Sequence, residues 1–232
     1  MQAFDVMTHD VISVSVDTEV REIAGLLLEH HISAVPVVGA EDQVLGIVSE
    51  GDLMHRVETG TERRSSWWLA NLFSGTQSAG EYVKSHGRKA GEVMTPNPIT
   101  IDEEMPLDEV AKLLEKHRIK RVPVVRDGRL VGIVSRANLL RGLALAGVSK
   151  AQAPSSDDRE IRAAIIKELK EHTDVMADRL NVMVSGGEVQ LWGLVESKQE
   201  RLAVQVAAEN VSGVTRVENH LGFMPRGGLS GT

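Results

Sequence analysis

Two short motifs in this sequence place a serine three residues before an acid or an amide. The first is Ser49-Glu-Gly-Asp52 and the second is Ser135-Arg-Ala-Asn138, and each follows an apolar run that predicts a strand. A helix that begins at such a serine presents free backbone N–H groups and the positive end of its dipole, which suit a phosphate. The serine hydroxyl can contact that phosphate or a ribose, and oxygens of Asp52 and Asn138 can accept from ribose hydroxyls.

The same spacing also has a purely structural interpretation. In a capping box, the serine side chain accepts from the N–H three residues on, and the later side chain accepts from the N–H of the serine. Asp52 and Asn138 are the right residue types for that role as well. The motifs alone therefore predict either phosphate and ribose contacts or a pair of helix caps.

Both motifs lie in an internal repeat. The segment VMTHDVISV from residue 6 returns as VMTPNPITI from residue 93, an offset of 87 residues. The match continues from 30–38 to 117–125, and after the loss of one residue it runs from 45–53 to 131–139. Because a repeated unit can bury its apolar face against its own copy, we expect two similar units packed about a pseudo-two-fold axis.

Each copy predicts the element order β-α-β-β-α. A short strand near residues 11–14 precedes a helix whose apolar residues within 20–27 recur at i, i+3, i+4 and i+7. Two β-rich runs follow at 34–38 and 44–48, and Asp127–Gly128 predicts a tight hairpin turn in the second copy. The predicted fold class is therefore α/β (α+β), built from two such repeats.

A different unit follows the repeats. Ile161, Ile165 and Leu169 mark one face of a helix, and an alternating run from 181 to 195 turns at Gly186–Gly187. A second helix near 197–210 and a last strand near 213–221 complete a small α-β-β-α-β domain. The predicted boundaries are 1–60 for repeat one, 61–91 for an inter-repeat helical segment, 92–147 for repeat two, 148–158 for a linker, 159–224 for the C-terminal domain and 225–232 for a mobile tail.

The inter-repeat segment contains a concentrated apolar cluster in a chain with 3% aromatic residues. Its members are Trp67, Trp68, Leu69, Leu72 and Phe73. Such a cluster either covers the core of its own module or a dimer seam, or it forms a docking patch for another protein.

Composition narrows the possible functions. The 232 residues include no cysteine, which removes disulfides, thiolate metal sites and cysteine nucleophiles. The formal net charge of −7 argues against a nucleic-acid partner. Neither a signal peptide nor a membrane-spanning stretch is found, so the expected location is cytoplasmic. The motifs of common nucleotide hydrolases, dehydrogenases, serine hydrolases and metalloproteases are missing, and the histidines lack metal-ligand spacing, so we expect neither an enzyme nor a metal site.

The repeated residues resemble tandem CBS domains. The resemblance rests on VMT, on H-x-I-x-x-x-P-V-V at 30–38 and 117–125, and on G-I-V-S-x-x-D/N-L at 46–53 and 132–139. It implies a cleft between the copies that binds AMP, ADP, ATP or S-adenosylmethionine, with Mg²⁺ as an optional companion of a polyphosphate. It also implies a homodimer through the CBS repeats. In the implied site, Asp52 and Asn138 hold ribose, Ser49 and Ser135 lie at its phosphate end, and backbone at Ser13, Ala34, Val35, Thr100, Arg121 and Val122 flanks the base.

Charge distinguishes the two copies. Residues 6–60 carry two basic and ten acidic side chains, a net charge of −8, whereas residues 94–147 carry nine basic and seven acidic ones, a net charge of +2. Lys120, Arg121 and Arg136 adjoin the second motif, and guanidinium groups bind phosphate through charge-assisted bonds. A polyphosphate is therefore expected to prefer the second copy, unless these cations are an ordinary solvated face.

The C-terminal unit resembles a BON domain. The resemblance rests on V-x-V-x-x-G-x-V-x-L-x-G-x-V at 182–195, S-x-x-E-R at 197–201 and G-V-x-x-V-x-N at 213–219. BON domains are linked to phospholipid association, which makes a lipid contact through Trp192 one alternative to a core role for that residue. The combined prediction is a regulatory sensor in which an adenosine ligand of the CBS pair acts through the BON domain on an unknown protein partner. The alternative is a scaffold or membrane-peripheral protein with a vacant CBS cleft.

Overall fold

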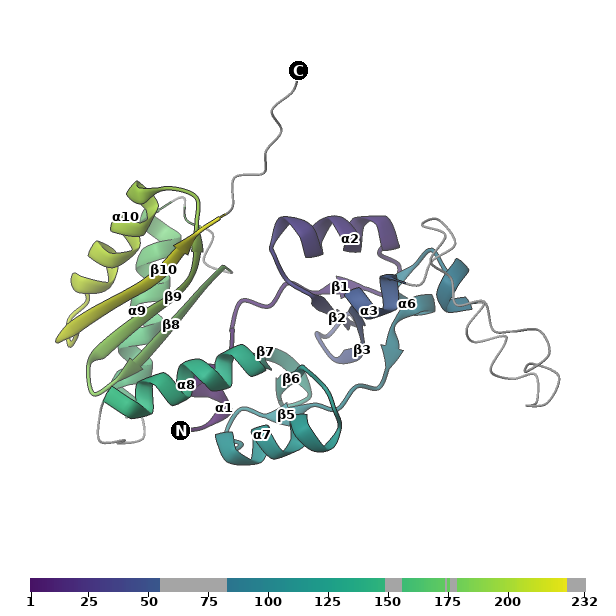
Figure 1. Ribbon diagram of the computed structural model, residues 1–232, viewed down its shortest axis with the longest axis horizontal. Helices are drawn as coiled ribbons and strands as arrows, with labels where there is room; N and C mark the ends of the chain where they lie inside the picture. Colours follow the sequence, from purple (N-terminus) through teal and green to yellow (C-terminus); the bar gives the residue numbers. More distant parts are fainter. Residues whose placement is uncertain (55–82, 149–155, 174, 176–178, 225–232) are drawn as a thin grey trace, which may run out of the picture. The chain divides into compact units, whose positions relative to one another are not determined.

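The computed structural model describes residues 1–54, 83–148, 156–173, 175 and 179–224 (Figure 1). The chain forms two compact units. One unit comprises Val11–Ile101 and Val122–Val131, and the other comprises Met1–Asp10, Asp102–Arg121 and Gly132–Thr232. The predicted apolar cluster at Trp67–Phe73 and the predicted tail at 225–232 lie outside the described residues.

The first repeat has the predicted order of strands and helices. A short helix, α1 (Ala3–Val6), precedes it. Its elements are β1 (Val14–Ser15), α2 (Val20–Glu29), β2 (Ala34–Val38), β3 (Val44–Ser49) and α3 (Glu50–Leu53). The apolar face of α2 packs through Ile23 and Leu27 into a core with Val35, Val37 and Val48 of the sheet. The predicted first strand is shorter than expected, since it begins only at Val14.

The second repeat follows the same plan. Its elements are α6 (Ala90–Val93), β4 (Thr95–Pro96), β5 (Ile101–Asp102), α7 (Leu107–Lys116), β6 (Arg121–Arg126), β7 (Arg129–Ser135) and α8 (Arg136–Val148). The sheet order is β5-β6-β7. Asp127 and Gly128 have φ angles of 51° and 78°, so the predicted hairpin turn uses two left-handed residues, as a tight β-hairpin requires.

The C-terminal domain also has the predicted order. Its elements are α9 (Ser156–His172), β8 (Leu180–Ser185), β9 (Glu188–Val195), α10 (Lys198–Glu209) and β10 (Arg216–Phe223). The sheet order is β10-β9-β8, with β8 antiparallel and β10 parallel to β9. Both helices cover one face of this sheet, as Figure 1 shows, and Ile165, Leu169 and Val204 pack there against Val182 and Leu191. α9 begins within the predicted linker at Ser156.

A polar clamp joins α10 to β10 and explains two of the sequence motifs. Arg201 Nη2 donates to the carbonyl oxygen of Asn219 at 3.1 Å, and Asn219 Nδ2 donates to the carbonyl oxygen of Arg201 at 3.2 Å. Asn219 Oδ1 also accepts from Arg201 Nε and from Leu221 N. The arginine of S-x-x-E-R and the asparagine of G-V-x-x-V-x-N therefore have a structural role.

The two repeats do not coincide with the two compact units, because each repeat's first segment packs against the other repeat. β4 of the second repeat pairs with β3 of the first, which gives the order β1-β2-β3-β4. In the other unit, Thr8 N donates to the Ile133 carbonyl oxygen of β7 at 3.0 Å. The repeats therefore exchange their first segments, which the self-comparison of the sequence did not predict.

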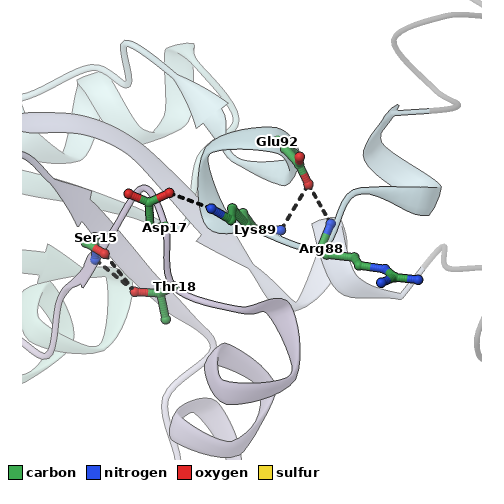
Figure 2. Close-up of polar contacts among 6 residues, drawn as sticks. All are labelled: Ser15, Asp17, Thr18, Arg88, Lys89 and Glu92. Carbon is green, nitrogen blue, oxygen red and sulfur yellow. Dashed lines mark hydrogen bonds and ion pairs between the residues drawn. The ribbon is translucent and has the colours of Figure 1, made fainter.

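Backbone and side-chain contacts hold the exchanged segment of the second repeat, and Figure 2 shows the side-chain contact between Lys89 and Asp17. Ala90 N and Gly91 N donate to the carbonyl oxygens of Thr18 and Val16 at 2.8 and 2.9 Å. Lys89 Nζ lies 2.8 Å from Asp17 Oδ1, and this hydrogen bond raises the pKa of Lys89 above its ordinary value. Both side chains of that ion pair are exposed, so the backbone bonds contribute more to the attachment.

Each exchanged segment also inserts a methionine over a glycine. A Cβ built at Gly46 would collide with Met94, and a Cβ built at Gly132 would collide with Met7. These four residues belong to the repeated VMT and G-I-V-S motifs. The motifs therefore encode one packing contact, made once in each unit, in which a glycine leaves room for a methionine side chain.

We expect Gly46→Ala to lower the free energy of unfolding by about 1–3 kcal/mol, because the added methyl group overpacks this contact. Gly25→Ala is the matched control, since a Cβ at that position in α2 meets nothing within 4 Å. It should raise stability by about 0.5–1 kcal/mol, because alanine is the better helix former. Thermal unfolding of both variants checks the pair, and equal effects would contradict the packing argument. Combining Gly46→Ala with Met94→Ala should cost no more than Met94→Ala alone.

Candidate ligand-binding site

The first serine motif forms a closed cap at the end of β3. Ser49 donates to Asp52 Oδ2 from its backbone N at 3.0 Å and from its hydroxyl at 2.7 Å. The other carboxylate oxygen, Oδ1, accepts from Lys84 Nζ at 3.3 Å. The side chain of Asp52 keeps 13% of its surface exposed. The capping interpretation is therefore confirmed here, and the carboxylate oxygen that the cap does not use contacts a half-exposed lysine.

The second motif forms the same cap with a different side-chain partner. Asn138 Oδ1 accepts from the backbone N and the hydroxyl of Ser135 at 2.8 and 2.5 Å. Asn138 Nδ2 donates to the carbonyl oxygen of Val6 at 2.8 Å, and the residue is 2% exposed. An aspartate at this position would place a carboxylate against that carbonyl oxygen. The N–H donor of its side-chain amide therefore explains why asparagine stands here. A ribose can bind Asn138 only if one of these hydrogen bonds is replaced by a bond to the ribose.

Backbone hydrogen bonds join each serine motif to the residue just before β2 or β6. Glu50 N donates to the Ser33 carbonyl oxygen, and Arg136 N donates to the Lys120 carbonyl oxygen, both at 3.1 Å. Ala34 is the strand partner of Ser49, so the predicted base-flanking backbone of Ala34 and Val35 lies beside the first motif. Ser13 and Thr100 are exposed and precede β1 and β5.

The predicted residues fall into two groups. Ser13, Ala34, Val35, Ser49, Asp52, Thr100 and Val122 belong to one compact unit, and Lys120, Arg121, Ser135, Arg136 and Asn138 belong to the other. The predicted residues therefore form two groups, one on each unit, which are termed the first and the second half-site. Each half-site combines a serine-capped helix start with the beginning of a strand.

The cations of the second half-site include one residue that sequence reasoning missed. Arg136 lines a cavity of about 500 Å³ between α7 and α8 together with Arg118, and its Nη2 donates to the Ile119 carbonyl oxygen at 3.3 Å. Arg118 has a φ of 56°, a left-handed conformation at the end of α7. Its place in the charged run KHRIKR was the available signal. Lys120 is exposed and Arg121 is half-buried.

Metal-ion clusters and membrane-spanning helices are two further features that bear on function. Within the described parts of the chain, no three His, Asp or Glu side chains group closely enough to hold a metal ion. No helix in those parts combines the length and the apolar character needed to cross a bilayer.

Comparison with known proteins assigns the parts of the chain. The CBS domain model matches residues 3–59 and 90–145, and the BON domain model matches residues 157–224. The predicted repeats and C-terminal domain are therefore confirmed as tandem CBS domains and a BON domain.

Relatives share the CBS pair. CBSX1, a chloroplastic CBS domain-containing protein of Arabidopsis thaliana, is 33% identical over 144 residues, which are 57% of this chain and 59% of that protein. Hypoxic response protein 1 of Mycobacterium tuberculosis is 27% identical over 141 residues, which are 61% of this chain and 84% of that protein. The match thus spans less than two thirds of CBSX1.

A solved structure supports the fold of the CBS pair. The crystal structure of CBSX2 in complex with AMP has a TM-score of 0.55 and 28% sequence identity, and the similarity covers 63% of this chain and 98% of that one. The agreement of family models, relatives and fold leads to one assignment. This chain is a tandem CBS-domain protein with a C-terminal BON domain.

Proposed function

We propose that this protein is a regulatory sensor whose CBS pair binds an adenosine-containing ligand and whose BON domain transmits the bound state. The similarity to AMP-bound CBSX2, which extends over nearly all of that chain, carries the proposal. The two serine-capped helix starts support the proposal, because each brings a serine hydroxyl and a carboxylate or amide together, and these groups can bind ribose or phosphate when the cap bonds exchange. No step of this function requires catalysis, and we propose a non-enzymatic role.

The first half-site is better suited to ribose than the second. Asp52 Oδ1 engages Lys84 through one contact of 3.3 Å, so a pair of ribose hydroxyls can displace that lysine at small cost. Asn138 has both its oxygen and its nitrogen engaged in a nearly buried position. Of the two half-sites, we therefore expect the one with Asp52 to bind a ribose more readily, and the cationic one with Arg121, Ser135 and Arg136 to be preferred by the phosphates of a polyphosphate.

Ligand binding should raise the melting temperature. A ligand at 100 times its dissociation constant stabilises by about 2.7 kcal/mol, which corresponds to a rise of about 5–10 °C for a chain of this size. Thermal unfolding with AMP, ADP, ATP and S-adenosylmethionine, each with and without Mg²⁺, measures this rise. Asp52→Ala should weaken binding by about 10-fold or more, because it removes a charged acceptor.

Matched variants separate the ribose and phosphate assignments. Arg121→Ala should weaken ATP more than AMP, whereas Ala34→Ser at the equivalent first-repeat position should leave both nearly unchanged. Equal losses from these two variants would contradict the phosphate assignment. The absence of a temperature rise with every ligand would overturn the proposed sensor itself.

A scaffold role is the second candidate, and one observation favours it. Both serine motifs already form complete caps from the protein's own side chains. Under this alternative the CBS pair holds no nucleotide and the BON domain binds a partner protein or a phospholipid surface. Sedimentation of the full chain with phospholipid vesicles, together with the absence of a melting-temperature rise for every ligand, would support the scaffold.

We further propose that the sensor acts in the cytoplasm and forms a homodimer through its CBS repeats.

A further inference from the structure

Two buried amides share one backbone acceptor in the N-terminal helix. The carbonyl oxygen of Val6 accepts from Asn138 Nδ2 at 2.8 Å and from Asn181 Nδ2 at 3.1 Å. Asn138 belongs to the second serine motif, and Asn181 belongs to β8 of the BON domain. Asn138 and Asn181 are 2% and 4% exposed, respectively. A single peptide group therefore connects the candidate ligand site to the BON domain.

Charge complementarity supports this connection. Asp5 and Asp10 lie on the N-terminal segment, and α9 presents basic side chains to them. Lys170 Nζ lies 2.8 Å from Asp10 Oδ1, and Arg159 Nη2 donates to Gln2 Oε1 at 2.9 Å. The Arg159 guanidinium also lies 4.6 Å from the centroid of the Phe4 ring. The segment 1–10 thus binds the BON domain through polar, ionic and cation–π contacts.

Burial shows which face of the BON sheet takes part. Along β8, Val182 and Val184 face the domain's own core, so Asn181 and Met183 point to the opposite face. That face should be open to solvent in a domain whose helices cover only one side. Met183 is nevertheless fully buried, and Gln190 of β9 is nearly so.

Two arginine side chains, Arg162 and Arg141, are desolvated beside the BON sheet. Burial lowers the pKa of Arg162 to about 10, with Asp10 and Asp5 opposing the shift, and Arg162 Nε donates to the Val182 carbonyl oxygen at 2.7 Å. Arg141 of α8 lies 6.0 Å from the Trp192 ring, and burial lowers its pKa as well. Docking therefore covers a defined part of the sheet.

We propose that segment 1–10 is a ligand-responsive joint: an adenosine ligand whose phosphate, bound at the second half-site, accepts from Asn138 Nδ2 weakens the Val6 contact and releases the BON sheet face around Met183. This inference rests on the proposed nucleotide-binding function. A ligand bond to Asn138 Nδ2 competes directly with Val6, and loss of that bond removes one of the two fixed points of the joint. Linkage makes the effect reciprocal, so release of the BON domain raises ligand affinity.

A cysteine-free chain allows a direct test. Met183→Cys places one thiol in the full-length protein on the docked face, and the rate of its reaction with a maleimide reports release. Val182→Cys is the matched control, because Val182 is equally buried but faces the domain core. A saturating ligand from the thermal-shift panel should accelerate labelling at position 183 by about 5-fold or more and leave position 182 unchanged.

A second set of variants tests the joint without a ligand. Asn138→Ala and Asn181→Ala, each combined with Met183→Cys, should accelerate labelling at position 183, whereas Lys167→Ala on the exposed side of α9 should not. Asn181→Ala should also tighten ligand binding several-fold.

The outcomes separate the two proposals. A ligand that raises the melting temperature without changing the labelling rate at position 183 would overturn the joint and leave the nucleotide-binding function intact. The absence of any melting-temperature rise would overturn both. Equal acceleration at positions 182 and 183 would indicate unfolding of the domain instead of release, and would also overturn the joint.

Discussion

Replacement of Asp158 by alanine is expected to destabilise the BON domain by about 3–5 kcal/mol, since it removes two charge-assisted hydrogen bonds of about 1.5–3 kcal/mol each. Asp158 is 3% exposed in the first turn of α9. Its two carboxylate oxygens accept from Gly186 N at 3.0 Å and from Gly187 N at 2.9 Å. The carboxylate therefore ties the helix to the β8–β9 turn, and alanine would leave two backbone donors without this acceptor.

Fluorescence of Trp192 can follow this loss, because Trp192 stacks on His220 within the BON domain, with 4.2 Å between ring centroids. Chemical unfolding of the full chain would be measured in a background in which Trp67 and Trp68 are phenylalanine. Asp157→Ala, at the exposed neighbouring position, is the control and should change stability by less than about 0.5 kcal/mol. Equal midpoints for the two variants would show that the turn contact contributes nothing.

Gly193→Ala is expected to have an effect of similar size, about 3–5 kcal/mol, for a reason of backbone geometry. Gly193 in β9 has a φ of 137°, a conformation that residues with a side chain rarely adopt. A Cβ there would also collide with the carbonyl oxygen of Arg179 and lie 3.1 Å from Leu180 Cα. Because these neighbours are backbone atoms at the start of the paired strand β8 and in the residue just before it, they cannot move aside without disturbing the sheet.

Gly186→Ala provides the comparison for this second variant. Gly186 also has a positive φ, of 60°, but a Cβ at that turn position meets nothing within 4 Å. Only the left-handed strain remains, and the expected cost is about 1–2 kcal/mol. The same fluorescence-detected unfolding measures both variants. A Gly193→Ala protein as stable as the Gly186→Ala protein would show that the backbone collision is relieved.

Local periodicity predicted most of the elements. The helix expected near 197–210 spans Lys198–Glu209, and the strand expected at 34–38 begins and ends at those residues. These elements follow from side-chain spacing along a short stretch of chain. Side-chain spacing does not predict which other segment of the chain each strand pairs with. Thr8 and Thr95 occupy equivalent repeat positions, and nothing in their neighbours indicates that each would join the other repeat's sheet.

At the candidate site, the two helix caps were predicted from the sequence, and the ligand contacts stay predictions. Motif spacing located both helix caps, and it correctly paired Ser49 with Asp52 and Ser135 with Asn138. The donor function of Asn138 could not be predicted, because its acceptor is a backbone carbonyl oxygen 132 residues away in sequence. Every residue type carries a backbone carbonyl oxygen, so no sequence pattern could have identified Val6 as the acceptor.

The exchange of first segments has a consequence for any chain that carries a single copy of this repeat. Such a chain would contain both the first segment and the edge strand that pairs with it. In the present fold, however, each first segment pairs with the edge strand of the other copy, so in a single-copy chain it would have to pair with a second molecule. Two identical chains could satisfy each other by reciprocal swapping, and the present tandem arrangement makes that swap covalent. A gene fragment cut at the repeat boundary after residue 60 would keep the edge of β3 and lose β4, and would therefore expose an unpaired strand.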